Sequence, residues 1–139
     1  MDDCQAAVPV ECDSCDGPAV GQVYETIIDG RLHWVLTHEC GDSFVEAMGW
    51  DETPGDLRQA LLDQCGTYRL RLSAEVTGVA VMRVLRAGGT SLAAVPEALA
   101  VLTGPGRPGT EMELQLLAGR LRAAGASATV ERDRDATDG

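Results

Sequence analysis

The dipeptide Asp29-Gly30, set between two apolar runs, constrains the fold of this chain most strongly. The segment GQVYETIIDGRLHWVLTHEC is rich in β-branched and aromatic residues on both sides of it. Asp-Gly readily adopts the positive φ angles of a tight hairpin turn. With the turn here, Ile28 pairs with Arg31, and the register continues until Gly21 lies opposite His38. The returning strand is therefore expected to end near the segment that precedes the hairpin.

Two thiols precede this hairpin, and an imidazole and a third thiol follow it. Cys12 and Cys15 are two residues apart, a spacing that lets both sulfurs of one turn reach a single ion. His38 and Cys40 follow the returning strand, where alternate residues project to one side. These four residues predict a tetrahedral Zn²⁺ site. The arrangement over residues 10–42 resembles a zinc ribbon, in which a cysteine knuckle precedes a hairpin and a second ligand pair follows it.

The cysteines also allow other interpretations. A redox Cys-x-x-Cys stands at the start of a helix, whereas Gly17-Pro18 leads into a hairpin here. The thiols could equally be unligated. The chain has five cysteines and lacks a signal-peptide pattern, so metal ligands or reduced thiols are expected in preference to disulfides. Cys65 is expected in the core and Cys4 in a loose N-terminal segment.

From residue 53 onward, the pattern alternates between helices and strands. Thr53 as the cap and Pro54 at the first position predict a helix over 54–65. The period-two pattern of TYRLRLS predicts a strand with one buried face. Three helical segments follow; Pro96 divides the second of them, and a capping box at Thr110 begins the third. The loop TGPGRPG is too rich in glycine and proline for a central strand, and ASATVE closes the pattern as a short strand.

Two segments of the second half resemble the C-terminal domain of the bacterial ribosomal large-subunit stalk protein: GVAVMRVLRAGGTSL and GTEMELQLLAGRLRAAGASATVE. The resemblance implies a small α/β sandwich with the order β-α-α-(β)-α-β. In that family, basic residues on the first two helices dock translational GTPases, which makes Arg83 and Arg86 candidate partner-binding residues. The alternative is that both arginines lie on the solvated face of an amphipathic helix.

The predicted fold class is therefore α+β, a ribbon-like β-hairpin with a zinc knuckle followed by an α/β sandwich. The expected divisions are a hairpin region over 1–52, a connecting helix over 53–65, a stalk-like domain over 66–132 and a flexible tail over 133–139.

The net charge of −11 argues against binding to nucleic acid or to an anionic membrane. No stretch approaches the roughly 20 apolar residues of a membrane span, and a cytoplasmic location is expected. Acidic side chains that could form an electrostatic face towards a basic protein partner gather in one part of the sequence, at Asp42, Glu46, Asp51 and Glu52. A solvated loop and helix start is the alternative interpretation of this cluster.

No nucleophile motif, phosphate-binding glycine loop or helical His-Glu-x-x-His is present in the sequence. We therefore expect a non-catalytic, acidic protein-binding module with a structural zinc, which sequesters or neutralises a basic partner in the manner of an immunity protein. One alternative is an accessory factor of the ribosome or of a translational GTPase. A second alternative is a thiol redox or zinc-dependent enzyme.

Overall fold

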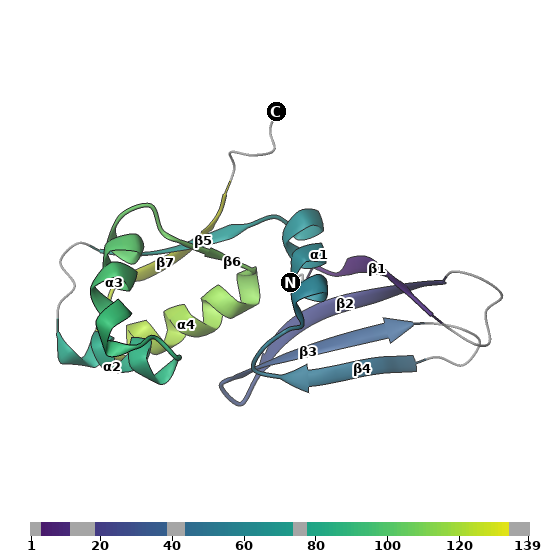
Figure 1. Ribbon diagram of the computed structural model, residues 1–139, viewed down its shortest axis with the longest axis horizontal. Coiled ribbons are helices and arrows are strands. Elements are labelled where there is room, and N and C mark those ends of the chain that lie inside the picture. Colours follow the sequence, from purple (N-terminus) through teal and green to yellow (C-terminus); the bar gives the residue numbers. More distant parts are fainter. Residues whose placement is uncertain (1–3, 12–18, 39–43, 74–77, 134–139) are drawn as a thin grey trace. The chain divides into compact units, whose positions relative to one another are not determined.

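The computed structural model describes residues 4–11, 19–38, 44–73 and 78–133 (Figure 1). The chain divides into two compact units, Met1–Gly66 and Thr67–Gly139. Among the described residues, the first unit combines an antiparallel sheet with one helix, and the second combines an antiparallel sheet with several helices. The α+β class predicted from the sequence is confirmed.

The sheet of the first unit has four strands in chain order: β1 (Ala6–Val10), β2 (Ala19–Ile28), β3 (Arg31–His38) and β4 (Phe44–Trp50). Strands β2 and β3 form the predicted hairpin, with Ile28 paired to Arg31. The turn residues Asp29 and Gly30 have φ angles of 52° and 76°, as a type I′ turn requires. The hairpin is thus the centre of a larger sheet, because β1 and β4 extend it on both sides.

One face of this sheet packs against helix α1 (Gly55–Cys65). Ala6, Val8 and Val23 of the sheet are buried against Leu57 and Leu61 of the helix. The two leucines are four residues apart and so share one side of the helix. Helix α1 therefore completes the core of the first unit.

The start of α1 differs from the prediction. The helix has Pro54 as its N-cap residue and no side-chain cap, while Thr53 is buried. The Thr53 hydroxyl donates a hydrogen bond of 2.5 Å to Oε2 of Glu25, a carboxylate that is itself only 3% exposed. A buried carboxylate needs hydrogen-bond donors, and the Thr53 hydroxyl is one of them instead of capping the helix. The predicted Thr53 cap is therefore wrong.

Strand β1 is fastened to the end of α1 by covalent and polar links. Cys4 and Cys65 form a disulfide between residues 61 positions apart. The side-chain amide of Gln64 donates to the carbonyl of Ala7 and accepts from its N–H, both at 2.8 Å. The expectation of reduced thiols is wrong for this cysteine pair, because the docking of β1 brings Cys4 to the helix end.

The second unit follows the order β5 (Tyr68–Leu72), α2 (Val79–Ala87), the 3-10 turn η1 (Leu92–Ala94), α3 (Val95–Thr103), β6 (Arg107–Gly109), α4 (Glu111–Ala123) and β7 (Ala128–Arg132). This matches the predicted order of elements. The sheet order is β6-β5-β7, so the glycine- and proline-rich segment forms a short strand at an edge, where proline is tolerated.

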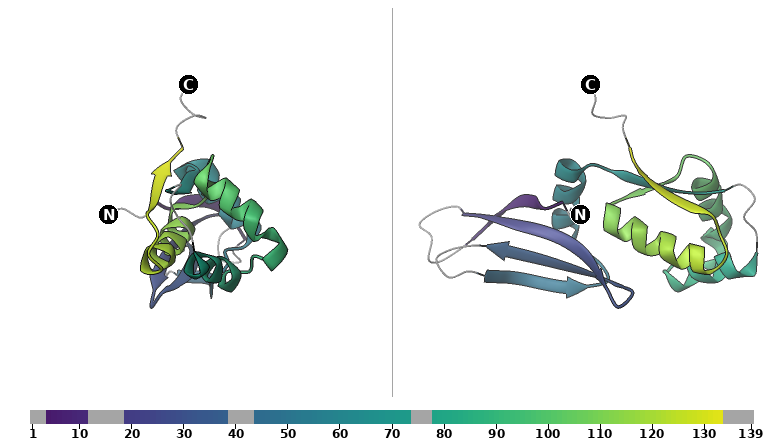
Figure 2. Two further views of the ribbon diagram at one scale, coloured as in Figure 1. Left: turned by 90° about the vertical axis from the view of Figure 1, so that its left-hand side faces the viewer. Right: turned by 180° about the vertical axis from the view of Figure 1, so that it is seen from behind.

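The three helices lie to one side of this sheet (Figures 1 and 2). Leu70 and Leu72 of β5 belong to one buried cluster with residues from all three helices. As predicted, Thr110 caps α4, because its Oγ1 accepts from the N–H of Glu113 at 3.3 Å. No helix in the described ranges is both long and apolar enough to cross a membrane.

Candidate protein-binding surface

The net negative charge of the chain lies in the first unit. Residues 1–66 contain 14 acidic and 2 basic residues, a formal charge of −12, while residues 67–139 contain 8 acidic and 9 basic residues, a charge of +1. A unit with this much unbalanced charge attracts oppositely charged proteins and repels a copy of itself. The first unit is therefore the better candidate for a charge-guided binding module.

The sheet of this unit has a second face, opposite the one that packs on α1. Side chains alternate between the faces of a strand, so the registers assign to this open face Val20, Tyr24, Ile28, Arg31, His33, Val35, Met48 and Trp50, of which Val35 is itself buried. Met48 is 59% exposed and Trp50 is 42% exposed. The open face thus presents large apolar side chains to solvent.

Trp50 is held in place by its neighbours on the open face. The His33 ring lies with its centroid 4.3 Å from that of the indole, and Cζ of Arg31 lies 4.7 Å from the indole centroid. Arg31 donates two hydrogen bonds to the Asp51 carboxylate, Nε to Oδ1 at 3.1 Å and Nη2 to Oδ2 at 3.0 Å. These bonds raise the pKa of Arg31 above its ordinary value.

A half-exposed tryptophan that is already fixed loses little conformational entropy on binding, and tryptophan and arginine are typical of interface hot spots. The sequence prediction included Asp51 but not Arg31, His33 or Trp50. The hairpin register, together with strand alternation, could have placed Arg31 and His33 on one face. Their contact with Trp50 depends on the pairing of β4 with β3, which no local pattern in the sequence indicates.

The other predicted acidic residues are only partly described. Glu52 is exposed and directly follows Asp51. Asp42 and the side chain of Glu46 lie outside the described residues. The structure therefore brings one predicted carboxylate, Asp51, to the tryptophan and leaves Glu52 beside it in the chain.

Of the four predicted zinc ligands, His38 is described, while Cys12, Cys15 and Cys40 lie outside the described residues. His38 is buried at the end of β3, with Nδ1 3.1 Å from the carbonyl oxygen of Val20. A carbonyl only accepts, so Nδ1 carries the proton of this hydrogen bond. Within the described residues, no three His, Cys, Asp or Glu side chains gather as a metal site would need.

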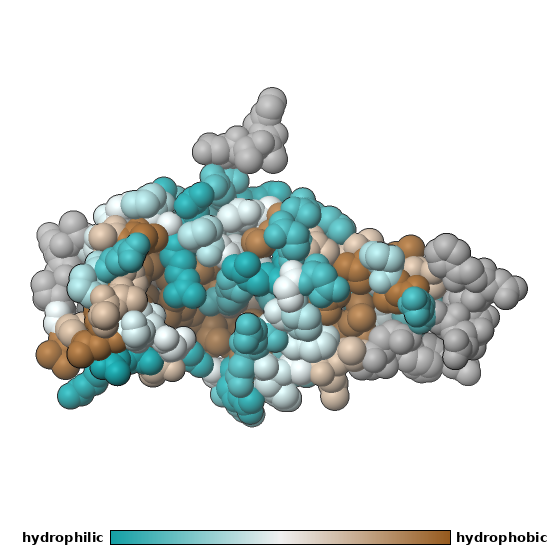
Figure 3. All heavy atoms as spheres, in the orientation of Figure 1, coloured by the Kyte–Doolittle hydropathy of each residue, from teal (hydrophilic) through white to brown (hydrophobic). Residues whose placement is uncertain are grey.

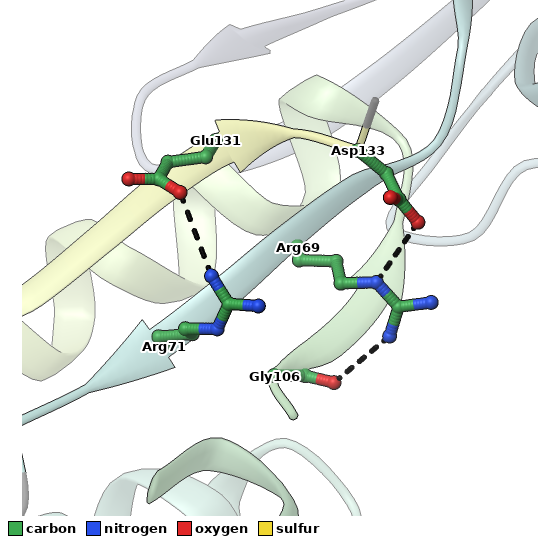
Figure 4. Close-up of polar contacts among 5 residues, drawn as sticks. All are labelled: Arg69, Arg71, Gly106, Glu131 and Asp133. Atoms are coloured by element: carbon green, nitrogen blue, oxygen red, sulfur yellow. Dashed lines mark hydrogen bonds and ion pairs between the residues drawn. The ribbon is translucent and has the colours of Figure 1, made fainter. Parts of the chain in front are cut away.

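The sheet of the second unit also has a polar face, and its arginines are ion-paired. Arg69 Nε lies 3.0 Å from Oδ2 of Asp133, and Arg71 Nη1 lies 3.5 Å from Oε1 of Glu131 (Figure 4). Arg69 also donates to the carbonyl of Gly106 at 3.4 Å. These contacts offset the positive charge of β5 within the sheet itself.

The predicted partner-binding arginines of the second unit lie on α2. Arg83 and Arg86 are both exposed, and residues three apart share one side of a helix. Val79, at the start of the same helix, is 61% exposed, and Figure 3 shows apolar residues at the surface near α2. The helix therefore presents basic and apolar groups together.

Comparison with known proteins gives no relative: no family model, no curated protein and no solved structure matches this chain.

Proposed function

We propose that this chain is a non-catalytic protein-binding module whose acidic first unit sequesters or neutralises a basic protein partner, as an immunity protein does. The division of charge carries the proposal: the first unit has a formal charge of −12 and the second of +1. Such a field speeds the encounter with a basic protein and disfavours acidic ones. Met48 and Trp50 on the open face supply apolar contact once the partner has arrived.

The test compares proteins that differ in apolar contact but not in charge. The wild-type chain and the double variant Met48→Ser/Trp50→Ser are immobilised, and the proteins they capture are identified at an ionic strength of about 0.05 M and again at about 0.5 M. The wild type is expected to retain a basic protein at low salt, to release it at high salt, and to bind it more tightly than the variant does. Equal capture by both proteins, or a captured protein that is not basic, would contradict the proposal.

We further propose that the same unit holds a structural Zn²⁺ through Cys12, Cys15, His38 and Cys40, as its resemblance to a zinc ribbon implies. The position of His38 supports this, because it ends the returning strand of the hairpin, as the second ligand pair of a zinc ribbon does. Val10 pairs with Ala19, and His38 pairs with Phe44. The β1–β2 and β3–β4 connections therefore leave the sheet at the same end.

Elemental analysis of protein purified under chelator-free conditions that keep the Cys4–Cys65 disulfide intact tests the zinc site. One zinc per chain is expected in the wild type, with loss in both Cys12→Ser and His38→Ala. Metal-free wild-type protein would remove the site from the proposal. Rapid alkylation of Cys12 or Cys15 in the native, zinc-loaded protein would instead favour the alternative of a thiol redox or zinc-dependent enzyme.

A second candidate function is that of an accessory factor of the ribosome or of a translational GTPase. It is favoured by the exposed pair Arg83 and Arg86 on α2, at the positions that the resemblance to the stalk domain assigns to partner binding. Cosedimentation with ribosomes, lost in Arg83→Ala/Arg86→Ala and kept in Arg69→Ala, would support this function over sequestration. Failure of the wild type to cosediment would dismiss it.

A further inference from the structure

The two edges of the first sheet differ in how far their backbone groups are already used. At the β1 edge, the amide of Gln64 bonds to both backbone groups of Ala7, and Pro9 has no N–H to offer. At the other edge, no described strand follows β4 in the sheet order. An additional strand is therefore obstructed beside β1, whereas β4 remains the place where one could pair.

The direction in which the backbone groups of β4 point follows from one hydrogen bond and the register. The N–H of Asp51 donates to the carbonyl of Leu32 at 2.8 Å, one position beyond the paired residues His33 and Trp50. Residues of an antiparallel ladder alternate between positions that bond to the partner strand and positions that do not. Gly49 lies two positions before Asp51, so its backbone N–H and C=O also point towards β3. Met48 lies three positions before Asp51, so its backbone N–H and C=O point away from β3.

The outward backbone positions of β4 are thus also its exposed apolar positions. Met48 directs its N–H and C=O to the edge, and Trp50 directs its N–H there, while both side chains stand on the open face. The Trp50 carbonyl is already used, since it accepts from the N–H of Glu52 at 2.9 Å. A strand laid beside β4 would find backbone partners and apolar side chains in one place.

We propose that β4 accepts an extended segment of the basic partner as a fifth strand. This deepens the proposed function and depends on it. Alternate side chains of the segment would pack beside Met48 and Trp50, and lysine or arginine residues between them would face a unit whose charge is −12. Main-chain hydrogen bonds supply affinity in this mode, and the alternate side chains supply specificity.

The charge of the first unit also selects between a partner and a second copy of the chain. Pairing two β4 edges would bring together two units of −12, and like charges across an interface oppose association. The same charge attracts a segment rich in lysine or arginine. The occupant inferred for the edge is therefore a basic, extended segment of another protein.

The probe for strand addition is a fluorescein-labelled peptide of about eight residues, a common strand length, in which lysine and valine alternate. A second peptide with the same sequence is N-methylated at the valines, and a third at the lysines. Both keep the charge and the side chains but lose backbone donors on one edge. The wild-type chain is expected to bind the parent peptide, at low ionic strength, about tenfold or more tightly than at least one methylated form.

Two variants at one position separate backbone from side chain. Met48→Pro removes an N–H that faces away from β3, so the ladder within the sheet stays intact, while Met48→Ala removes only the side chain. Met48→Pro is expected to weaken peptide binding about tenfold relative to Met48→Ala. Equal affinities of the two variants would overturn strand addition.

Hydrogen exchange in the wild-type chain provides a reading that does not depend on the folding of a variant. The amides of Met48 and Trp50 are expected to exchange more slowly when the parent peptide is bound, and the amide of Gly49, which already faces β3, is not. Unchanged exchange at Met48 and Trp50 in the bound state would contradict the proposal even if Met48→Pro failed to fold.

The possible outcomes separate the inference from the function on which it depends. Salt-sensitive binding of all three peptides with equal affinity would leave an acidic binding module without strand addition. No salt-sensitive binding of any peptide would count against both. A concentration-dependent dimer in light scattering that is lost in Met48→Pro would assign the edge to a second copy and overturn the choice of partner.

Discussion

Removal of the Cys4–Cys65 disulfide is expected to destabilise the first unit selectively. The bond joins residues 61 positions apart, so it closes almost the whole unit into one loop. In the double variant Cys4→Ser/Cys65→Ser, the hydrogen bonds between Gln64 and Ala7 can still form. The change therefore acts mainly by giving freedom back to the unfolded chain.

The magnitude follows from the length of the loop. Closing a loop of this length removes chain entropy equivalent to about 4 kcal/mol at room temperature. A unit of this size unfolds with a guanidinium dependence of about 2 kcal/mol per molar. The unfolding midpoint of the first unit is therefore expected to fall by about 2 M in the double variant.

Two spectroscopic signals report on the two units separately. Trp34 and Trp50, the only tryptophans in the chain, both lie in the first unit. Within the described residues, three of the four α-helices and most of the helical residues lie in the second unit, which therefore dominates the far-ultraviolet ellipticity. Tryptophan fluorescence is expected to shift with the variant, while the major ellipticity transition keeps its midpoint.

A matched control uses reductant. It should move the wild type to the midpoint of the double variant and leave that variant where it is. A loss below about 1 kcal/mol would refute the entropic reasoning. Equal shifts of fluorescence and ellipticity would refute the assignment of the bond to one independent unit.

Three further predictions concern single side chains. Thr53→Val should lower the unfolding free energy by about 1–3 kcal/mol, because the buried Glu25 carboxylate loses a donor; Thr53→Ser should restore most of it in urea titrations. Gly21→Ala should lower the unfolding free energy by about 1–3 kcal/mol, because the added Cβ would lie 2.8 Å from a carbonyl oxygen of β3. Gly119→Ala, on the exposed side of α4, should raise the unfolding free energy by about 0.5–1 kcal/mol. The opposite order of the two variants in thermal unfolding would contradict this. Burial raises the pKa of the Tyr68 hydroxyl above its ordinary value of 10.0. The stability that this residue contributes is therefore complete below pH 10.0 and is lost as pH rises through the folded-state pKa. Tyr68→Phe should lack this loss in unfolding measurements between about pH 9 and 12.

Features of the fold that depend on a few neighbouring residues could be predicted from the sequence. Asp29-Gly30 sets the hairpin turn because its positive φ angles are a local property. The Thr110 cap involves residues three apart, and Pro96 separates the 3-10 turn from α3 within a few residues. In each case, the physical cause lies inside one short segment.

Features that depend on distant partners could not be predicted in this way. Strand β4 contains Gly49 and lacks clear alternation, and it forms because β3 offers it a partner. Thr53 has the sequence signature of a cap, yet Glu25, 28 residues away, takes its hydroxyl. The candidate surface could not be predicted for the same reason, since Trp50 contacts Arg31 and His33 only when β4 is paired with β3.

The bond between Cys4 and Cys65 also decides how mechanical force would pass along the chain. Tension applied between the N-terminus and the second unit would run through the sulfur bridge from residue 4 to residue 65, so the intervening backbone would carry none of it. The module that we infer to hold a partner could then be pulled by its neighbours in the chain without being stretched. The β4 edge and the segment bound to it would be loaded only by force that acts on the partner.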